Sequence, residues 1–333
     1  MTASVSSSNV PPLNKYLAST GFCGLNGSVA TGKKTRDEPL KTLSVFLSDE
    51  SQGELPKSEM IKLWKGIFYC FWMSDKSLVQ QALASELAEL VLSITNTVSA
   101  FSFLNGFWET MVREWNGIDR LRLDKYLMLV RRFVNVAFRL LIRHDWNSKM
   151  CQEYNAILEH LDGPLCPSDG RVSTGLVYHI TDVYLEELEK NLRSSSSAKP
   201  IPLALILSPF FNLVTQTPLA TTYNHIQSSL FQPLLSSFSL IEGDESRARK
   251  RRRVDNGSSG IYSSIITNSC LDDASLEVKL SPKMLRRKIL RRLFETASSV
   301  KTRDANRRKI YALWRAENDD DEYYDSEVEL DSE

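Results

Sequence analysis

The sequence has few of the residues from which metal centres are built. It contains five cysteines and four histidines among 333 residues, and no two cysteines form a CxxC pair. Cys151, His160 and Cys166 share one stretch, but they lack the closely spaced ligand pairs that zinc sites use. An odd number of widely separated cysteines is typical of reduced thiols inside a cell. We therefore predict no metal ion and no cofactor.

The sequence also lacks a hydrophobic run long enough to cross a membrane. Its most apolar segment, residues 201–214, is shorter than the roughly 20 residues that span a bilayer, and it contains Pro209. The first residues show no basic region followed by an apolar stretch, so a secretory signal is not expected. We expect a soluble intracellular protein without a membrane partner.

Motifs of known catalytic sites are missing as well. No GxSxG, HExxH or glycine-rich dinucleotide signature occurs. Residues 27–34, GSVATGKK, come near the phosphate-binding pattern GxxxxGK[ST], but Lys34 replaces the hydroxyl residue that should hold Mg²⁺. Because no strand is predicted before this loop, a glycine-rich surface loop is the better interpretation. We predict that the protein is not an enzyme and has no small-molecule substrate.

The net charge of zero hides two opposite blocks of charge. Residues 283–315 contain twelve Lys or Arg and two Asp or Glu, whereas residues 317–333 contain ten Asp or Glu and no cation. Such segregation indicates a basic contact surface followed by an acidic tail. The tail could instead cover the basic surface of its own chain, or bind basic ribosomal proteins, and the sequence does not separate these possibilities.

Two groups of cations are candidates for function. The first is a dense run within a polar segment, interpreted as a nuclear localisation signal or an RNA-contacting arm, with nuclear import favoured over a merely solvated basic loop: Arg247, Arg249, Lys250, Arg251, Arg252 and Arg253. The second covers one side of two amphipathic helices and has few acidic neighbours: Arg286, Arg287, Lys288, Arg291, Arg292, Arg307, Arg308 and Lys309. The alternative for this second group is a solvated helix face, but because acidic partners are nearly absent we favour contact with an anionic ligand, above all a phosphate backbone. Leu285, Ile289, Leu293 and Phe294 form the apolar side of the first of these helices.

Helical periodicity dominates the rest of the chain. In residues 60–73 the aromatic residues Trp64, Phe68, Phe71 and Trp72 recur at helical spacing without interleaved cations, which predicts a buried core and not a platform for stacked bases. Further helices are expected at 78–94, 101–115, 118–145, 147–161, 172–192, 203–214 and 222–238, the last either interrupted or started afresh at Pro233. No segment alternates in the manner of a strand, so no sheet is predicted. The fold class is all-α, an irregular helical repeat of the HEAT-like α-solenoid type.

Composition divides the chain into five parts. We expect a flexible leader at 1–32, a helical-repeat domain at 33–240 and a disordered linker with the basic run at 241–282. Basic C-terminal helices should follow at 283–316, and a disordered acidic tail at 317–333.

Several long strings resemble one known family. They are KKTRD at 33–37, KLWKGIFYCFWMSDKSLVQQALASELAEL from Lys62, FWETMVREWNGIDRLRLDKYLMLVRRF from Phe107, and GLVYHITDVYLEELEK from Gly175. These strings are similar to the ribosomal RNA processing protein 1 family of nucleolar assembly factors. The resemblance covers about residues 34–235 and resumes at 283–316. One departure is the stretch from Gly21 to Gly32, which the family lacks.

The resemblance implies a helical-repeat fold, residence in the nucleolus, and no known catalytic activity. It also implies a role in processing pre-ribosomal RNA within large-subunit precursors, with RNA contacted directly or indirectly and other large-subunit assembly factors as partners. The family's motif positions are occupied by Lys62, Trp64, Lys65, Asp75, Lys76, Arg113, Trp115, Asp119, Arg122, Asp124 and Lys125. Of these, Asp119, Arg122, Asp124 and Lys125 also have the spacing of structural ion pairs.

These expectations combine into a non-catalytic scaffold of pre-ribosomal particles, located in the nucleus and nucleolus. The alternative is a nuclear helical-repeat adaptor for protein partners outside ribosome assembly, in which the basic residues serve import alone.

Overall fold

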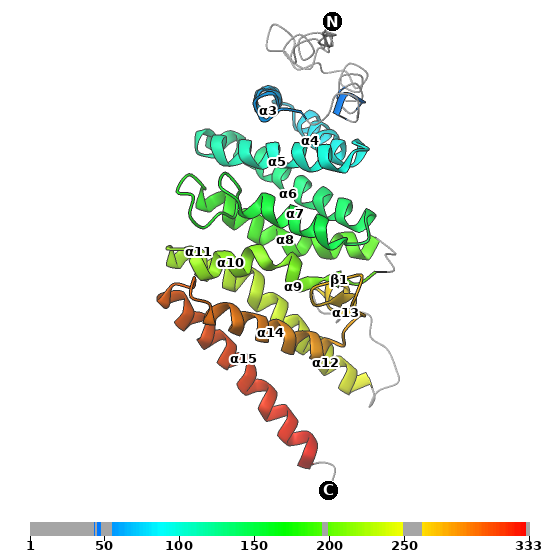
Figure 1. The fold of residues 1–333 in the computed structure, drawn as a ribbon, viewed down its shortest axis with the longest axis vertical. Coiled ribbons are helices and arrows are strands. Elements are labelled where there is room, and N and C mark those ends of the chain that lie inside the picture. The colour runs from blue at the N-terminus through cyan, green and yellow to red at the C-terminus, as the bar shows by residue number, and fades with distance from the viewer. Residues whose placement is uncertain (1–42, 44, 48–54, 195–198, 249–261, 331–333) are drawn as a thin grey trace, which may run out of the picture. The chain divides into compact units, whose positions relative to one another are not determined.

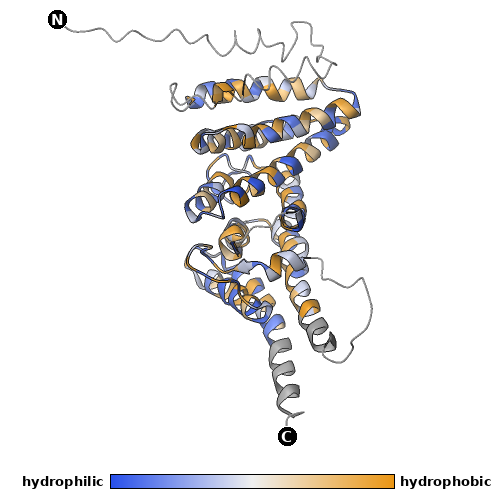
Figure 2. Ribbon diagram, turned by 90° about the vertical axis from the view of Figure 1, so that its right-hand side faces the viewer, coloured by the Kyte–Doolittle hydropathy of each residue, from blue (hydrophilic) through white to orange (hydrophobic). Residues whose placement is uncertain are grey.

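The computed structural model describes residues 43, 45–47, 55–194, 199–248 and 262–330, with the backbone alone at 242–248 and 319–330 (Figure 1). Apart from one pair of two-residue strands, every regular element in these ranges is a helix, so the predicted all-α helical-repeat class is confirmed. The helices carry hydrophilic and hydrophobic bands side by side (Figure 2), as expected for helices that each bury one face. The chain forms two compact units.

The first unit comprises residues up to Thr110 together with Gly117–Val136. It contains α3 (Lys57–Trp72), α4 (Ser77–Ser93), most of α5 (Thr97–Glu114) and the first part of α6 (Arg120–Arg143). The indole of Trp64 lies fully buried at its centre, with ring centroids 4.5 Å from Phe103 and 5.6 Å from Phe133, and its Nε1 donates to the carbonyl of Phe103 at 2.9 Å. Trp64, Phe68 and Phe71 are therefore core residues, as predicted, whereas Trp72 is only partly buried.

Charged residues of the family's motif hold the C-terminal end of α3. Lys125 Nζ donates to the carbonyl oxygens of Trp72 at 2.7 Å and Ser74 at 2.9 Å, and burial lowers the pKa of this ammonium to about 8. Arg122 pairs with Asp119 at 2.5 Å, and its guanidinium lies 5.0 Å from the centroid of the Trp72 ring. A cation at a helix C-terminus satisfies carbonyls that have no partner within the helix. These three motif residues thus have a structural role.

The second unit comprises Met111–Asn116 and the chain from Ala137 onward. It contains α7 (Ser148–Glu159), α8 (Thr174–Ser194), α9 (Leu203–Ile206), α10 (Ser208–Gln216), α11 (Ala220–Ile226), a π turn (Gln227–Phe231) and α12 (Gln232–Ala248). The helix predicted at 203–214 is two helices, because Pro209 suits the first turn of a new helix and not a helix interior. Tyr184 lies in the core against Phe138 and Phe210, with ring centroids at 4.9 and 4.7 Å.

The prediction of a disordered linker at 241–282 is wrong for residues 262–282. This segment contains α13 (Ser263–Thr267) and strand β2 (Ser269–Cys270), and β2 pairs in parallel with β1 (Ile201–Pro202). The short ladder also corrects the expectation that no strands would form. Tyr262, Ile265, Ile266 and Cys270 are buried. The segment is polar in composition, but these few apolar side chains are enough to fix it against the helices.

Two carboxylates hold the same segment by its backbone. The buried Glu189 of α8 accepts hydrogen bonds from the amides of Ser264 at 3.1 Å and Ile265 at 2.9 Å, so it supplies the missing partners at the start of α13. Glu277 accepts from the amides of Leu271, Asp272 and Asp273 at 2.8, 3.2 and 3.3 Å. Each contact replaces the water that these amides would lose on burial.

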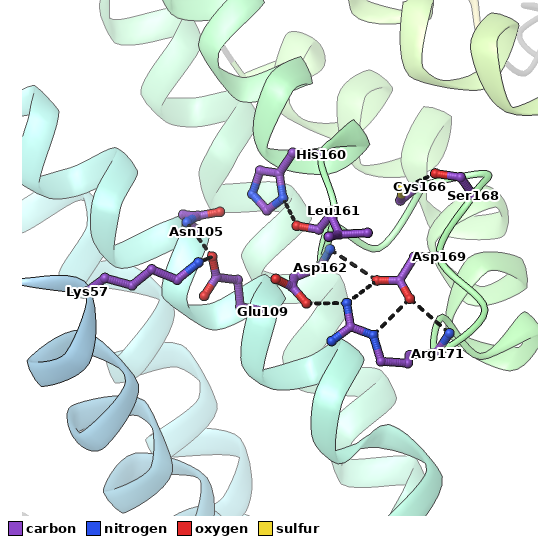
Figure 3. A network of polar contacts seen from close by, with 10 residues as sticks. All are labelled: Lys57, Asn105, Glu109, His160, Leu161, Asp162, Cys166, Ser168, Asp169 and Arg171. Atoms are coloured by element: carbon purple, nitrogen blue, oxygen red, sulfur yellow. Dashed lines mark hydrogen bonds and ion pairs between the residues drawn. The ribbon is translucent and has the colours of Figure 1, made fainter.

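The loop between α7 and α8 is closed by an arginine between two carboxylates (Figure 3). Arg171 contacts Asp169 through Nε at 2.9 Å and a terminal nitrogen at 2.7 Å, and it contacts Asp162 at 2.5 Å. Asp169 also accepts from the amide of Asp162, whose φ of 76° is a strained value for a residue other than glycine. The hydrogen bonds from Arg171 hold the pKa of Asp169 at about 2.

The close approach of α5 to α3 depends on Gly106. A Cβ at this position would lie 2.7 Å from Trp64 Nε1 and 2.8 Å from Met60 Cγ. We predict that Gly106→Ala lowers the free energy of unfolding by about 1–3 kcal/mol, because overpacking outweighs the gain in helix propensity of about 1 kcal/mol. Urea unfolding measures the change. Gly117→Ala, whose Cβ meets nothing within 4 Å, is the control and should differ little from wild type.

The Asp169 contact predicts an acid-dependent loss of stability. The pKa of this carboxyl is lower in the folded chain than in the unfolded chain, so its contribution is present above about pH 4 and disappears as the pH falls towards 2. Because Arg171 is largely exposed, we expect Asp169→Asn to cost about 1–2 kcal/mol at pH 7 and progressively less below pH 4.

Urea unfolding of this variant across pH 3–7 measures the effect, with the exposed Asp124→Asn as control. A difference from wild type that stays constant down to pH 3 would contradict the assignment.

Candidate functional site

The predicted basic helices form a hairpin within the second unit (Figure 1). It consists of α14 (Pro282–Ser298) and α15 (Asp304–Leu330), and the Ser281 side chain caps α14 by accepting from the amide of Met284. The helix α15 continues to Leu330, through most of the segment 317–333 for which a disordered acidic tail is expected. The hairpin packs on α10 and α12. Asn306 Nδ2 fixes it further by donating to the carbonyl of Thr217 at 2.8 Å.

Arg286 does not belong to the contact surface, which corrects the sequence-based assignment. Its side chain is only 3% exposed, and it donates to both the carbonyl and the carboxylate of Glu317 at 2.9 Å. Charge periodicity placed this residue with the solvated arginines because the pattern could not show that α15 packs on that flank of α14.

Three more of the proposed contact residues have structural partners. Arg307 donates to the carbonyls of Ala297, Ser299 and Thr302 at 3.0–3.2 Å, where α14 ends. The Lys309 ammonium lies 4.7 Å from the centroid of the Tyr223 ring and 3.2 Å from Asn224 Oδ1. The partly exposed Arg292 pairs with Asp272, and so ties α14 to the loop after β2.

The remaining predicted cations are at the surface. Arg287, Arg291 and Arg308 are exposed, and Lys288 is half-buried. Arg291 pairs with Glu295 at 2.9 Å, but both side chains are more than half exposed, so this ion pair is worth little and leaves the guanidinium accessible. Arg315 on α15 is exposed as well and extends the cationic surface. We call Arg287, Arg291, Arg308 and Arg315 the exposed arginine set.

Sequence reasoning missed an aromatic cluster beside these arginines. Phe294, which belongs to the predicted apolar side of α14, is 39% exposed, and its ring centroid lies 5.2 Å from that of Tyr311 and 5.0 Å from that of Trp314. Tyr311 and Trp314 are both partly exposed. Buried residues one position away fill the core instead: Leu293 on α14, and Ile310 and Leu313 on α15. The sequence does contain a signal for this cluster. On each helix the buried apolar positions are already filled, so an aromatic residue next to them in the sequence is left at the surface.

The basic run lies almost entirely outside the described residues. The backbone of Arg247 is in α12, whereas Arg249, Lys250, Arg251, Arg252 and Arg253 fall beyond the part that the structure describes. Its role in nuclear import stays a prediction. Residues 27–34, the phosphate-loop near miss, also lie outside the described ranges.

The titratable groups with the largest perturbations are in the core. Burial raises the pKa of the Cys151 and Cys270 thiols to about 12, so both are protonated and poor nucleophiles or metal ligands at neutral pH. Within the described ranges, no three His, Cys, Asp or Glu side chains gather in a way that could hold a metal ion. None of the helices in those ranges is both long and apolar enough for a membrane span.

Comparison with known proteins gives the family. The model of the family described as nucleolar protein, Nop52 matches residues 29–314, and so reaches through α14 into α15. The human ribosomal RNA processing protein 1 homolog B is 32% identical over 232 residues, which cover 68% of this chain and 29% of that protein. Homolog A from Mus musculus is 33% identical over 63% of this chain and 42% of its own length. The homolog from Dictyostelium discoideum is 25% identical over 84% of this chain and 54% of its length.

The chain therefore spans less than half the length of its human and mouse relatives. The family description agrees with the nucleolar localisation that the resemblance implied. The long match, which includes the helical core and most of the hairpin, confirms the sequence-based family assignment. The chain belongs to the Nop52 family of nucleolar proteins, together with the ribosomal RNA processing protein 1 homologs.

Proposed function

We propose that this protein is a non-catalytic scaffold of pre-ribosomal particles, required for ribosomal RNA processing and for production of the large ribosomal subunit. The observation that carries the proposal is the family match across residues 29–314, because the matched relatives are named for ribosomal RNA processing. The helical units supply rigid surfaces for other assembly factors. Nuclear entry is assigned to the basic run at 247–253.

The contact with pre-ribosomal RNA is assigned to the exposed arginine set. Buried or paired partners immobilise Arg286, Arg292 and Arg307, so these residues position the hairpin. The exposed arginine set lies on the two helices that Arg286, Arg292 and Arg307 hold in place. Phosphate groups are the natural ligands of clustered guanidinium groups, and each contact releases counterions, so the affinity should fall as salt rises.

The proposal includes no catalytic step. The strongly perturbed thiols and the Tyr154 and Tyr184 hydroxyls are buried, and burial raises their pKa values, which keeps them protonated. Groups in this state are suited to packing and not to proton transfer at neutral pH.

We predict that reversing the exposed arginine set to Glu weakens RNA association. With four phosphate contacts removed, the slope of log affinity against log salt should decrease by about three, and affinity should fall at least about a hundredfold at moderate salt. Electrophoretic mobility shift at several salt concentrations measures both quantities. A matched control reverses four exposed cations on other elements, Arg120, Arg131, Lys149 and Lys190, and should bind nearly as wild type.

The same variants test the function in cells depleted of the wild-type protein. Depletion should cause unprocessed precursor RNA to accumulate, and the control variant should restore processing while the reversed set does not. Normal precursor RNA after depletion would remove the processing role and favour the alternative, an adaptor for protein partners outside ribosome assembly. Restoration by the reversed set would leave the role intact but exclude direct contact through these arginines.

A further inference from the structure

The exposed aromatic cluster of the hairpin has no explanation in the packing of the core. Phe294 on α14 contacts both Tyr311 and Trp314 on α15, and the Tyr311 hydroxyl lies 3.0 Å from Ser298 Oγ. The interior of the hairpin is already filled by Leu290, Leu293, Ile310 and Leu313, which are all buried. Three adjoining aromatic rings held partly in water are therefore available to a ligand.

Cations lie on both sides of this aromatic seam. On α14, Arg287, Arg291 and Phe294 follow at i, i+4 and i+7, which places them on one face of the helix. On α15, Arg308, Tyr311 and Arg315 follow at i, i+3 and i+7, and they also share a face. Three carboxylates of the hairpin are engaged with arginines: Glu295 with Arg291, Glu317 with Arg286, and Asp304 with Arg307.

We propose that this seam binds unpaired bases of single-stranded RNA by stacking, with the flanking arginines on the adjoining phosphates. The inference rests on the proposed RNA contact and specifies its substrate. Every base has a π-face that can stack on an aromatic ring, whereas in a duplex those faces are covered by neighbouring base pairs. A purely cationic surface would bind both forms of RNA, so the aromatic residues add a preference for single strands.

The test compares two fluorescent RNAs, an unstructured 12-nucleotide single strand and a duplex of the same length, by anisotropy at fixed salt. The variants are Phe294→Leu and Trp314→Leu, which keep an apolar side chain at the seam and remove the ring. We expect each to lower single-strand affinity about tenfold, to change duplex affinity less than twofold, and to leave the salt slope unchanged. The exposed Tyr69→Leu on α3 is the matched control and should bind both RNAs as wild type.

Circular dichroism and thermal unfolding of each variant establish that the hairpin stays folded. Wild-type affinity of both leucine variants for the single strand would overturn the inference, as would an equal loss for both RNAs. If a leucine variant binds RNA as wild type but a partner protein is lost from the precursor particles, the seam binds a protein, and the inference is overturned as well. In each of these cases the proposed RNA contact through the exposed arginine set can still hold, because the arginine reversals test it separately. If the wild-type chain binds neither RNA, the proposed RNA contact itself fails.

Discussion

A buried guanidinium determines how the two C-terminal helices meet. Arg286 is almost inaccessible to water, so its charge must be balanced within the protein, and Glu317 of α15 provides both a carbonyl and a carboxylate oxygen at 2.9 Å. A buried charge without its partner costs several kcal/mol, which leaves the hairpin one favourable register. The exposed arginine set and the aromatic seam both take their positions from this register. The position of the candidate site therefore depends on this internal ion pair together with the contacts of Arg292, Arg307 and Asn306.

The same use of polar groups recurs where the chain joins distant segments. Glu189 on α8 binds the start of α13, about 75 residues later, and Lys125 on α6 binds the end of α3, about 50 residues earlier. In each case a charged side chain supplies the hydrogen bonds that a helix end lacks. Apolar burial provides most of the stabilising free energy, whereas these contacts select which helix ends meet. Irregular helices without a repeated sequence can in this way stack in a single arrangement.

Periodicity was sufficient to predict most of the long helices, because each has an apolar face that must be buried, but it missed α13 and the division of 203–214 into two helices. It was also sufficient for the aromatic core around Trp64. Near Pro233 the chain changes from a π turn to an α-helix without a break. The ordered structure of residues 262–282 could not be predicted, because it depends on hydrogen bonds to Glu189 in a different helix. The burial of Arg286 and the exposure of Phe294 could not be predicted for a related reason. Both lie at the edge of the apolar face of α14, where only the position of α15 decides which one is covered.

Arg307 of α15, which covers the end of α14, has an electrostatic effect in addition to its hydrogen bonds. The last carbonyl groups of a helix carry a partial negative charge, which repels any approaching polyanion. Arg307 covers this pole by donating to Ala297, Ser299 and Thr302. The last carbonyls of α14 are therefore covered by a guanidinium, which also pairs with the exposed Asp304 at 3.1 Å. For the RNA contact proposed above, this end of α14 would repel a phosphate group less than an uncovered helix terminus does.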